Sequence, residues 1–97
     1  MHVISKKALK EFWEAHHAGS KRPLEIWYRA MRRGSFKNWS ELRSAFPTAD
    51  KVGSKIVFNI GGNKYRLVVV IHFNRGVVFV RNVLMHKEYD EGKWKNG

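Results

Sequence analysis

The hydrophobic positions of the chain recur with a helical period in its first half and with a strand-like pattern in its second half. After Ser5, a residue type that often caps helices, Leu9, Phe12 and Trp13 lie at helical spacing on one side. The pattern therefore predicts a first helix that ends near His17.

A second helix is predicted to begin near Pro23, which suits the first helical turn, and to end at Gly34. Its apolar positions recur at intervals of three and four residues, at Leu24, Trp27, Tyr28 and Met31. A third and shorter helix, Trp39–Ala45, is expected to follow Asn38 and to stop before Pro47.

The second half of the chain predicts strands. Segments 55–60, 64–73 and 77–85 are rich in β-branched residues, and turns at 61–63 and 74–76 separate them. Two successive hairpins form an antiparallel meander, and the apolar pair Val3-Ile4 is able to add an edge strand. We therefore expect an α+β fold, with two to three N-terminal helices on one face of a three- to four-stranded, mainly antiparallel sheet.

Residues 1–97 are predicted to form a single domain, because the length suits one domain and leaves little room for a second. Residues 90–97, which are polar apart from one tryptophan, are expected to form a flexible tail. No apolar run approaches the roughly 18 residues of a membrane span, and no secretory signal follows the N-terminal basic residues. The absence of cysteine excludes a disulfide scaffold and a thiolate metal site. We expect a cytoplasmic protein without a membrane partner.

The longest predicted strand has two unlike faces. One face is an unbroken apolar set of Tyr65, Leu67, Val69, Ile71 and Phe73, as expected beneath helices. The alternate face carries Lys64, Arg66, Val68, Val70 and His72. Arg81 lies well inside the neighbouring strand, and neither it nor Arg66 has a carboxylate nearby in sequence. Cations without acidic partners on a half-open sheet face are suited to binding phosphate.

The charge of the chain indicates a polyanionic partner. It contains 19 Lys and Arg residues against 8 Asp and Glu residues, a formal net charge of +11. The basic residues occur in both halves of a chain that is 43% hydrophobic, so the charge belongs to a folded body. Such a charge most often serves nucleic-acid binding.

Several kinds of chemistry lack the residues that they need. The predicted strands contain no Asp or Glu, whereas a two-metal nuclease requires several converging carboxylates. The tandem pair His16-His17 lacks metal-ligand spacing, and Gly61-Gly62 joins two strands and opens no helix, so we expect neither a metal nor a cofactor. The residues present allow RNA cleavage by the substrate's own 2′-hydroxyl, which requires no metal. It needs a group that accepts the 2′ proton, cations at the phosphate and a group that protonates the 5′-oxygen.

Several motifs, spread over almost the whole chain, resemble one known family. The stretch 57–67, VFNIGGNKYRL, is followed by Phe79-Val80-Arg81 and by His86-Lys87-Glu88-Tyr89-Asp90. Together with the opening residues 1–9 and parts of segment 36–47, these motifs resemble the HigB family of bacterial toxins. The strand Tyr65-Arg66-Leu67 is similar, more loosely, to the wider RelE superfamily, which implies a RelE-like fold.

The resemblance implies a toxin of a type II toxin–antitoxin pair. HigB-like toxins are mRNA interferases that enter the A site of the 70S ribosome, on ribosomal RNA, and cut messenger RNA. The implied antitoxin is a helix-turn-helix protein that neutralises the toxin and represses the shared operon, so that the toxin meets DNA only through the antitoxin complex. The family pattern has an arginine at the position of Arg66, a basic or imidazole residue at that of His86, and a tyrosine such as Tyr89 near the chain end.

The residues and the resemblance together define a candidate catalytic site. Arg66 is predicted to bind the phosphate, because a planar guanidinium matches two phosphate oxygens. His86 is the candidate general acid or base because a histidine side chain titrates near neutral pH. Lys87 and Tyr89 compete with it for proton transfer, and Tyr89 is also suited to stacking on a base. Further RNA-binding contacts are expected from Lys55, Lys64 and Arg81.

Three other functions fit the same charge. A non-catalytic RNA- or ribosome-binding module would bind without cutting, and an inactive family member would persist as a binding partner. A DNA-binding repressor is disfavoured, because the basic helix near residues 22–33 lacks a partner helix of the helix-turn-helix type. New mRNA 5′ ends and growth arrest would distinguish the toxin from these alternatives.

Overall fold

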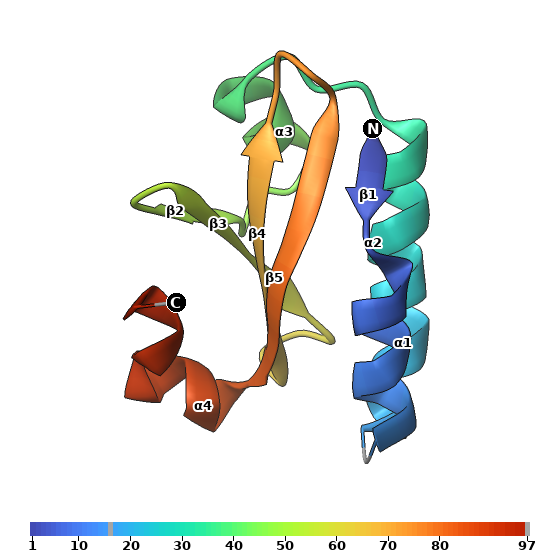
Figure 1. Ribbon diagram of the computed structural model, residues 1–97, viewed down its shortest axis with the longest axis vertical. Coiled ribbons are helices and arrows are strands. Elements are labelled where there is room, and N and C mark those ends of the chain that lie inside the picture. Colours follow the sequence, from blue (N-terminus) through green and yellow to red (C-terminus); the bar gives the residue numbers. More distant parts are fainter. Residues whose placement is uncertain (16, 97) are drawn as a thin grey trace.

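A computed structural model describes residues 1–15 and 17–96 of the chain (Figure 1). His16, a member of the histidine pair considered above for metal binding, and Gly97, the last residue of the predicted tail, lie outside the described residues. In chain order the elements are β1 (His2–Ile4), α1 (Lys6–Ala15), the 3₁₀ helix η1 (Ala18–Ser20), α2 (Lys21–Arg33), α3 (Trp39–Ala45), β2 (Asp50–Val52), β3 (Lys55–Ile60), β4 (Tyr65–His72), β5 (Val77–Met85), α4 (His86–Glu91) and the 3₁₀ helix η2 (Lys93–Asn96).

The strands form one five-stranded sheet in the order β1-β5-β4-β3-β2. Neighbouring strands from β2 to β5 pair antiparallel, whereas β1 lies parallel to β5. The predicted meander and the predicted edge strand at Val3-Ile4 are therefore confirmed. Strand β2 is an addition to the prediction, because Asp50, Lys51 and Val52 carry no alternating apolar pattern that would mark them as a strand.

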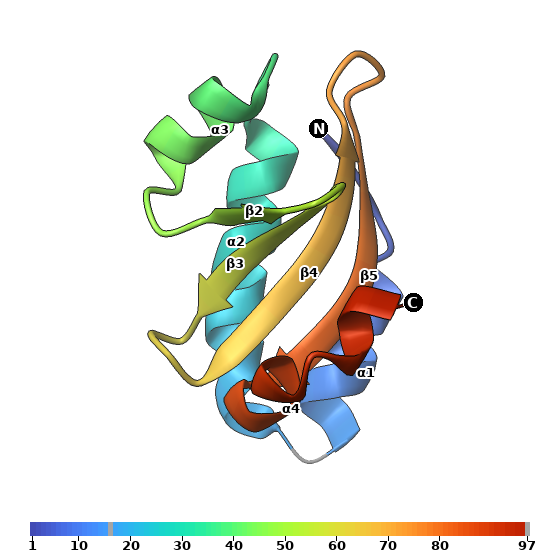
Figure 2. The ribbon, with the colours of Figure 1, turned by 90° about the vertical axis from the view of Figure 1, so that its left-hand side faces the viewer.

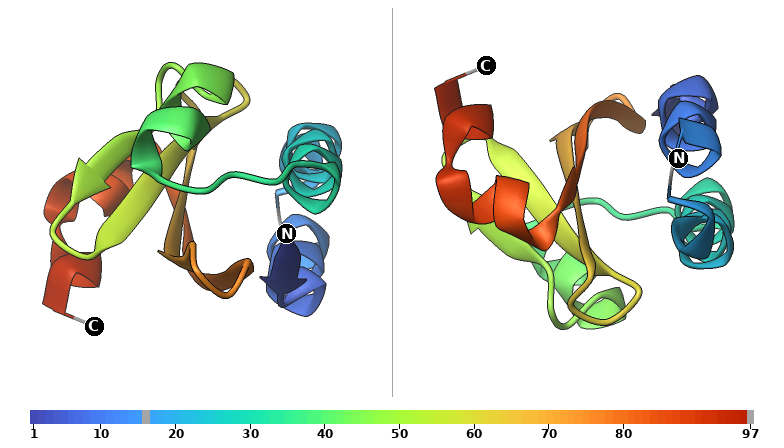
Figure 3. Two further views of the ribbon diagram at one scale, coloured as in Figure 1. Left: turned by 90° about the horizontal axis from the view of Figure 1, so that it is seen from above. Right: turned by 90° about the horizontal axis from the view of Figure 1, so that it is seen from below.

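The helices lie on both faces of the sheet. α1 and α2 cover one face, and α4 with η2 lies against the opposite face (Figures 1 and 3). α3 lies at the end of the molecule where α2 ends (Figure 2). The α+β class and the N-terminal helical layer agree with the prediction. Helix α4 is not predicted, because its six residues bury no side chain and so show no apolar period.

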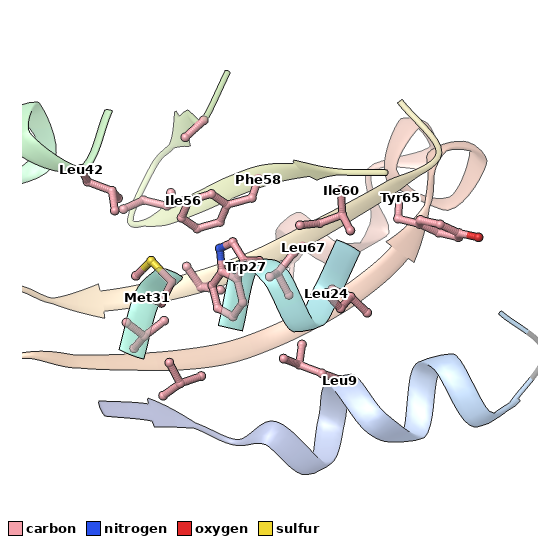
Figure 4. Close-up of a cluster of buried hydrophobic side chains, with 14 of the residues drawn as sticks. Leu9, Leu24, Trp27, Met31, Leu42, Ile56, Phe58, Ile60, Tyr65 and Leu67 are labelled. Atoms are coloured by element: carbon pink, nitrogen blue, oxygen red, sulfur yellow. The ribbon is translucent and has the colours of Figure 1, made fainter. Parts of the chain in front are cut away.

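The main core lies between the sheet and the layer of α1 and α2 (Figure 4). Leu24, Trp27 and Met31, from the predicted apolar side of α2, are at most 3% exposed and belong to one cluster with Phe58 and Leu67 of the sheet. Burying an apolar side chain of this size completely contributes about 1.5–3 kcal/mol. The predicted apolar face of β4 is confirmed, and it contributes Tyr65, Leu67 and Val69 to this core.

A second, smaller core lies on the other face and involves the C-terminal residues. Trp94 of η2 is 5% exposed and clusters with Val57 of β3 and Val68 of β4. Gly92, which has a φ of 76°, ends α4 and turns the chain into η2. Residues 90–97 were expected to form a flexible tail. The described residues 90–96 belong to the end of α4, the turn at Gly92 and η2, and Trp94 packs on the sheet. The physical reason is that the indole ring of Trp94 removes a large apolar area from water at this position.

Candidate functional site

The candidate site lies on the sheet face that α4 and η2 partly cover. Because side chains alternate along a strand, Arg66 and Val68 of β4 point away from the main core that contains Leu67. Strand pairing places Arg66 opposite Leu84, close to the point where β5 passes into α4. The His86 amide also donates a hydrogen bond of 3.1 Å to the Lys64 main-chain oxygen. The start of β4 and the start of α4 therefore meet.

Arg66 is a buried charged residue near the start of β4 on this face, and its side chain is held in place. The residue is only 8% exposed. Its Nη1 donates to the main-chain oxygens of Asn63 and Tyr65, and its Nη2 donates to Asn63 Oδ1, each over 3.2 Å. No carboxylate in the described part of the chain lies within ion-pair distance of this guanidinium. Arg66 is thus a buried cation that neutral oxygens orient and that no acidic residue among the described ones neutralises.

Tyr89 of α4 packs directly on Arg66. The guanidinium carbon lies 5.4 Å from the centre of the Tyr89 ring, within the range of a cation–π contact. The same ring stacks on the indole of Trp94, with a centroid separation of 5.0 Å and an interplanar angle of 15°. The structure therefore brings together two residues that were predicted for the site, and it adds Trp94, the one tryptophan of the segment that was expected to be a flexible tail.

His86 is the first residue of α4, and its position follows from how this helix begins. The Glu88 side chain accepts a 3.0 Å hydrogen bond from the Met85 amide, which satisfies one of the free N–H groups at the helix start. The His86 side chain is about half exposed, and its Nδ1 lies 3.6 Å from Asp90 Oδ2, one turn further along the helix. An exposed imidazole beside a carboxylate can exchange protons with a bound molecule.

Lys64 and Lys87 are exposed residues next to His86. Lys64 ends the turn before β4, and its main-chain oxygen accepts the hydrogen bond from His86. Lys87 follows His86 in α4. The structure therefore places both predicted lysines at the solvent edge of the site, where their ammonium groups can meet a polyanion.

Lys55, predicted as an RNA contact, lies on β3 at the same face of the sheet. Its ammonium group donates a 2.7 Å hydrogen bond to the Trp94 main-chain oxygen and lies 5.8 Å from the centre of the Trp94 indole. These contacts tie η2 to the sheet, which is a role that the sequence did not indicate.

Arg81, also predicted as an RNA contact, lies apart from the other candidates. The pairing of β4 with β5 shifts between Val68 and Val69, and Arg81 is the extra residue of the resulting bulge. Its exposed side chain lines a shallow depression together with Ala8 and Glu11 of α1. Arg66 and Arg81 were expected to share one sheet face. Leu84, not Arg81, lies opposite Arg66, and Arg81 lies beside α1, which covers the other face of the sheet.

Two residues of the site were missed by the sequence analysis. Asn63 orients Arg66, and the motif around it indicated only a tight turn. Trp94 buries its ring beside a cavity of about 380 Å³, and its only signal was a large aromatic residue in an otherwise polar segment. The cavity is lined by Asn82, Leu84, Glu88, Glu91, Lys93 and Trp94.

Within residues 1–15 and 17–96, no three or more His, Cys, Asp or Glu side chains are grouped so that they could hold a metal ion. Across the same residues, no helix is both long enough and apolar enough to cross a membrane.

Comparison with known proteins gives one consistent result. A family model described as HigB toxin, the RelE-like toxic component of a toxin–antitoxin system, matches residues 20–92. The chain is 36% identical to the mRNA interferase toxin HigB of Escherichia coli K12. The alignment spans 93 residues, which are 93% of this chain and 88% of that protein. The mRNA interferase HigB of Shigella flexneri matches to the same extent. The protein of the same name from Escherichia coli O6:H1 is 33% identical over 94 residues, which cover 94% of this chain and 90% of that protein.

Proposed function

The chain belongs to the HigB family, whose members are RelE-like toxic components of toxin–antitoxin systems. From this membership, we propose that the protein halts translation by cutting messenger RNA at the site around Arg66. Membership in the family implies two partners, an antitoxin and an mRNA target. The observation that carries the proposed site is the Arg66 guanidinium, which is buried, has no acidic neighbour in the described residues and lies against Tyr89.

The proposed reaction uses the 2′-hydroxyl of the RNA. The 2′-oxygen loses its proton and attacks the adjacent phosphorus, the bond between phosphorus and the 5′-oxygen breaks, and the 5′-oxygen takes up a proton. The products are a 2′,3′-cyclic phosphate and a 5′-hydroxyl end. Side chains that bind the phosphate and transfer protons suffice for each step, and DNA is resistant because it lacks the attacking group.

Arg66 is proposed to bind the reacting phosphate and the charge that develops on it. A guanidinium has five N–H groups, and the contacts to Asn63 and Tyr65 occupy three of them. Two N–H groups are left for phosphate oxygens. Because water is largely excluded around Arg66, its attraction for a phosphate is stronger than that of an exposed arginine.

His86 is proposed to transfer a proton, with Tyr89 and Lys87 as the alternative groups on the same helix. An RNA in which sulfur replaces the 5′-bridging oxygen assigns the step, because a thiolate leaves without being protonated. If His86 protonates the leaving oxygen, His86→Ala cuts the sulfur substrate at nearly the wild-type rate. If His86 instead accepts the 2′ proton, the variant remains slow on both substrates. The same comparison for Lys87→Ala and Tyr89→Phe tests the alternatives.

The remaining charge of the chain supports docking on ribosomal RNA. We propose that the protein acts in the A site of the 70S ribosome, and therefore in the cytoplasm. The net charge of +11 exceeds by far the one or two cations that the reaction needs, so a broad basic surface remains for binding. The antitoxin is proposed to be a helix-turn-helix protein, and the toxin to contact DNA only through the complex with it.

Induction of the gene in cells, with and without the neighbouring antitoxin gene, tests this function. Wild-type protein is expected to stop growth and to generate new mRNA 5′ ends, and the antitoxin gene should suppress both effects. Arg66→Ala and His86→Ala should restore growth at equal expression. Ribosome binding without new 5′ ends would instead identify a non-catalytic ribosome-binding module. Both variants staying fully toxic while folded would refute the assignment of the site.

A further inference from the structure

Trp94 touches the proposed cleavage site from outside the segment that matches the family model. The match ends at residue 92, whereas Trp94 lies in η2, after the turn at Gly92. Its ring is nevertheless among the most buried of the C-terminal residues that the structure describes, with 5% exposure.

One set of contacts fixes Trp94 to the sheet. Its ring belongs to the second core with Val57 and Val68, from the neighbouring strands β3 and β4. Its main-chain oxygen accepts the 2.7 Å hydrogen bond from the Lys55 ammonium group, which also lies over the indole at 5.8 Å. The sheet therefore holds Trp94 in two ways, by packing against its ring and by the Lys55 hydrogen bond to its main chain.

A second set of contacts connects Trp94 to Tyr89. The indole Nε1 donates a 2.9 Å hydrogen bond to the Tyr89 main-chain oxygen, and the two rings stack at 5.0 Å. The Gly92 amide donates to the same oxygen over 3.1 Å. Trp94 thus contacts both the backbone and the ring of the residue that packs on Arg66.

Helix α4 cannot hold Tyr89 in place by itself. It has six residues and buries none of them, and isolated helices shorter than about 12–15 residues are marginal in water. The first turn is fixed by the contacts of Met85 with Glu88 and of His86 with Lys64. Tyr89 lies beyond that turn. Its ring contacts Trp94 and Arg66, and its main-chain oxygen accepts hydrogen bonds from Trp94 Nε1 and from the Gly92 amide.

We propose that Trp94 is a positioning residue for RNA cleavage: anchored by Lys55 and the sheet, it holds the Tyr89 ring against the Arg66 guanidinium. The proposal rests on the function proposed above. It makes η2 part of the catalytic architecture, because a small displacement of a group in the site is enough to reduce the rate strongly.

Cleavage kinetics with ribosomes carrying mRNA give the first test. Trp94→Ala is expected to lower kcat by about 10- to 100-fold, as displacements of about 1 Å do, and to change KM little because the broad basic surface is intact. Trp94→Phe keeps a stacking ring and loses only the Nε1 donor, so most of the rate should return. In a Tyr89→Leu background, Trp94→Ala should have almost no further effect on kcat. Additive losses, or a change confined to KM, would overturn the proposal.

The NMR signal of the Arg66 Nε–H proton provides a test that does not depend on activity. The aromatic ring of Tyr89 shifts this signal, so Tyr89→Leu and Trp94→Ala should move it to a similar position, while Trp94→Phe should move it less. Trp39→Ala, which removes an indole from α3, serves as the control and should leave the signal unmoved. A signal unchanged in Trp94→Ala contradicts the positioning role. Absence of cleavage by the wild-type protein contradicts the proposed function instead, and the NMR result still decides the role of Trp94.

Discussion

Replacing Arg66 with methionine separates the contribution of this residue to folding from its contribution to cleavage. Methionine is a flexible apolar side chain that fills much of the space of the arginine stem and removes the charge. The change therefore tests whether a buried cation without an acidic partner in the described residues is kept for stability or for chemistry.

The contacts of Arg66 allow the stability effect to be worked out. Its three hydrogen bonds are long, at 3.2 Å, and go to neutral oxygens, so each contributes about 0.5 kcal/mol. The contact with Tyr89 adds about 0.5–2 kcal/mol. Against this gain of about 2–3.5 kcal/mol stands the desolvation of a buried charge, which costs several kcal/mol. The two contributions nearly cancel, and we expect Arg66→Met to change the free energy of unfolding by less than about 1 kcal/mol.

The expected effect on cleavage is much larger. Removing one donor that stabilises charge in a transition state lowers rates by about 10²–10³, or about 2.7–4 kcal/mol in activation free energy. Urea unfolding followed by tryptophan fluorescence measures stability, and the rate of mRNA cleavage on ribosomes measures activity. Arg75→Met is the control, because it removes an exposed positive charge from the turn between β4 and β5.

A loss of more than about 3 kcal/mol in stability, together with wild-type cleavage by the molecules that remain folded, would refute this reasoning. Arg66 would then be a structural residue.

Four further predictions follow from the same geometry. His86→Gln should abolish growth inhibition while changing the free energy of unfolding by less than about 0.5 kcal/mol, because the side chain is half exposed; persistent toxicity would contradict its role. Gly92→Ala and Gly76→Ala both place a side chain at positive φ with open space around it, and each should cost about 1–2 kcal/mol in thermal or urea unfolding. Only Gly92→Ala should also slow cleavage, and equal rates would argue against the importance of the turn into η2. Leu24→Ala should lower the free energy of urea unfolding by about 2–5 kcal/mol, because this fully buried side chain joins α2 to the sheet; a loss below about 1 kcal/mol would be inconsistent with that packing. Arg66→Met should reduce the slope of log affinity for single-stranded RNA against log salt concentration by about 0.7, the value for one phosphate contact, and an unchanged slope would exclude direct contact.

The sequence predicted those parts of the fold that have a strong apolar pattern. The period in α2 and the alternation in β4 follow directly from burial against the main core, so both elements and the face of β4 that carries Arg66 could be identified. The resemblance to HigB then marked Arg66, His86 and Tyr89 as candidates, and the structure shows that Arg66 and Tyr89 are in contact.

The features that the sequence did not predict depend on single contacts, which leave no periodic pattern of apolar residues in the sequence. Helix α4 forms through a hydrogen bond at its start and a tryptophan beyond its end, so no period marks it. The bulge at Arg81 is a local irregularity in pairing that no sequence pattern marks, and Arg81 lies beside α1 and not beside Arg66. Trp94 is buried by residues of β3 and β4 far from it in sequence, which a local interpretation of a polar segment cannot reveal.

The most direct test of the central claim is the chemistry of the new mRNA 5′ ends. Wild-type protein, incubated with ribosomes carrying mRNA, should produce fragments with 5′-hydroxyl ends and matching 2′,3′-cyclic phosphates, and Arg66→Met should produce almost none. Fragments with 5′-phosphate ends, or equal cleavage by Arg66→Met, would contradict RNA cleavage by 2′-hydroxyl attack at a site built around Arg66.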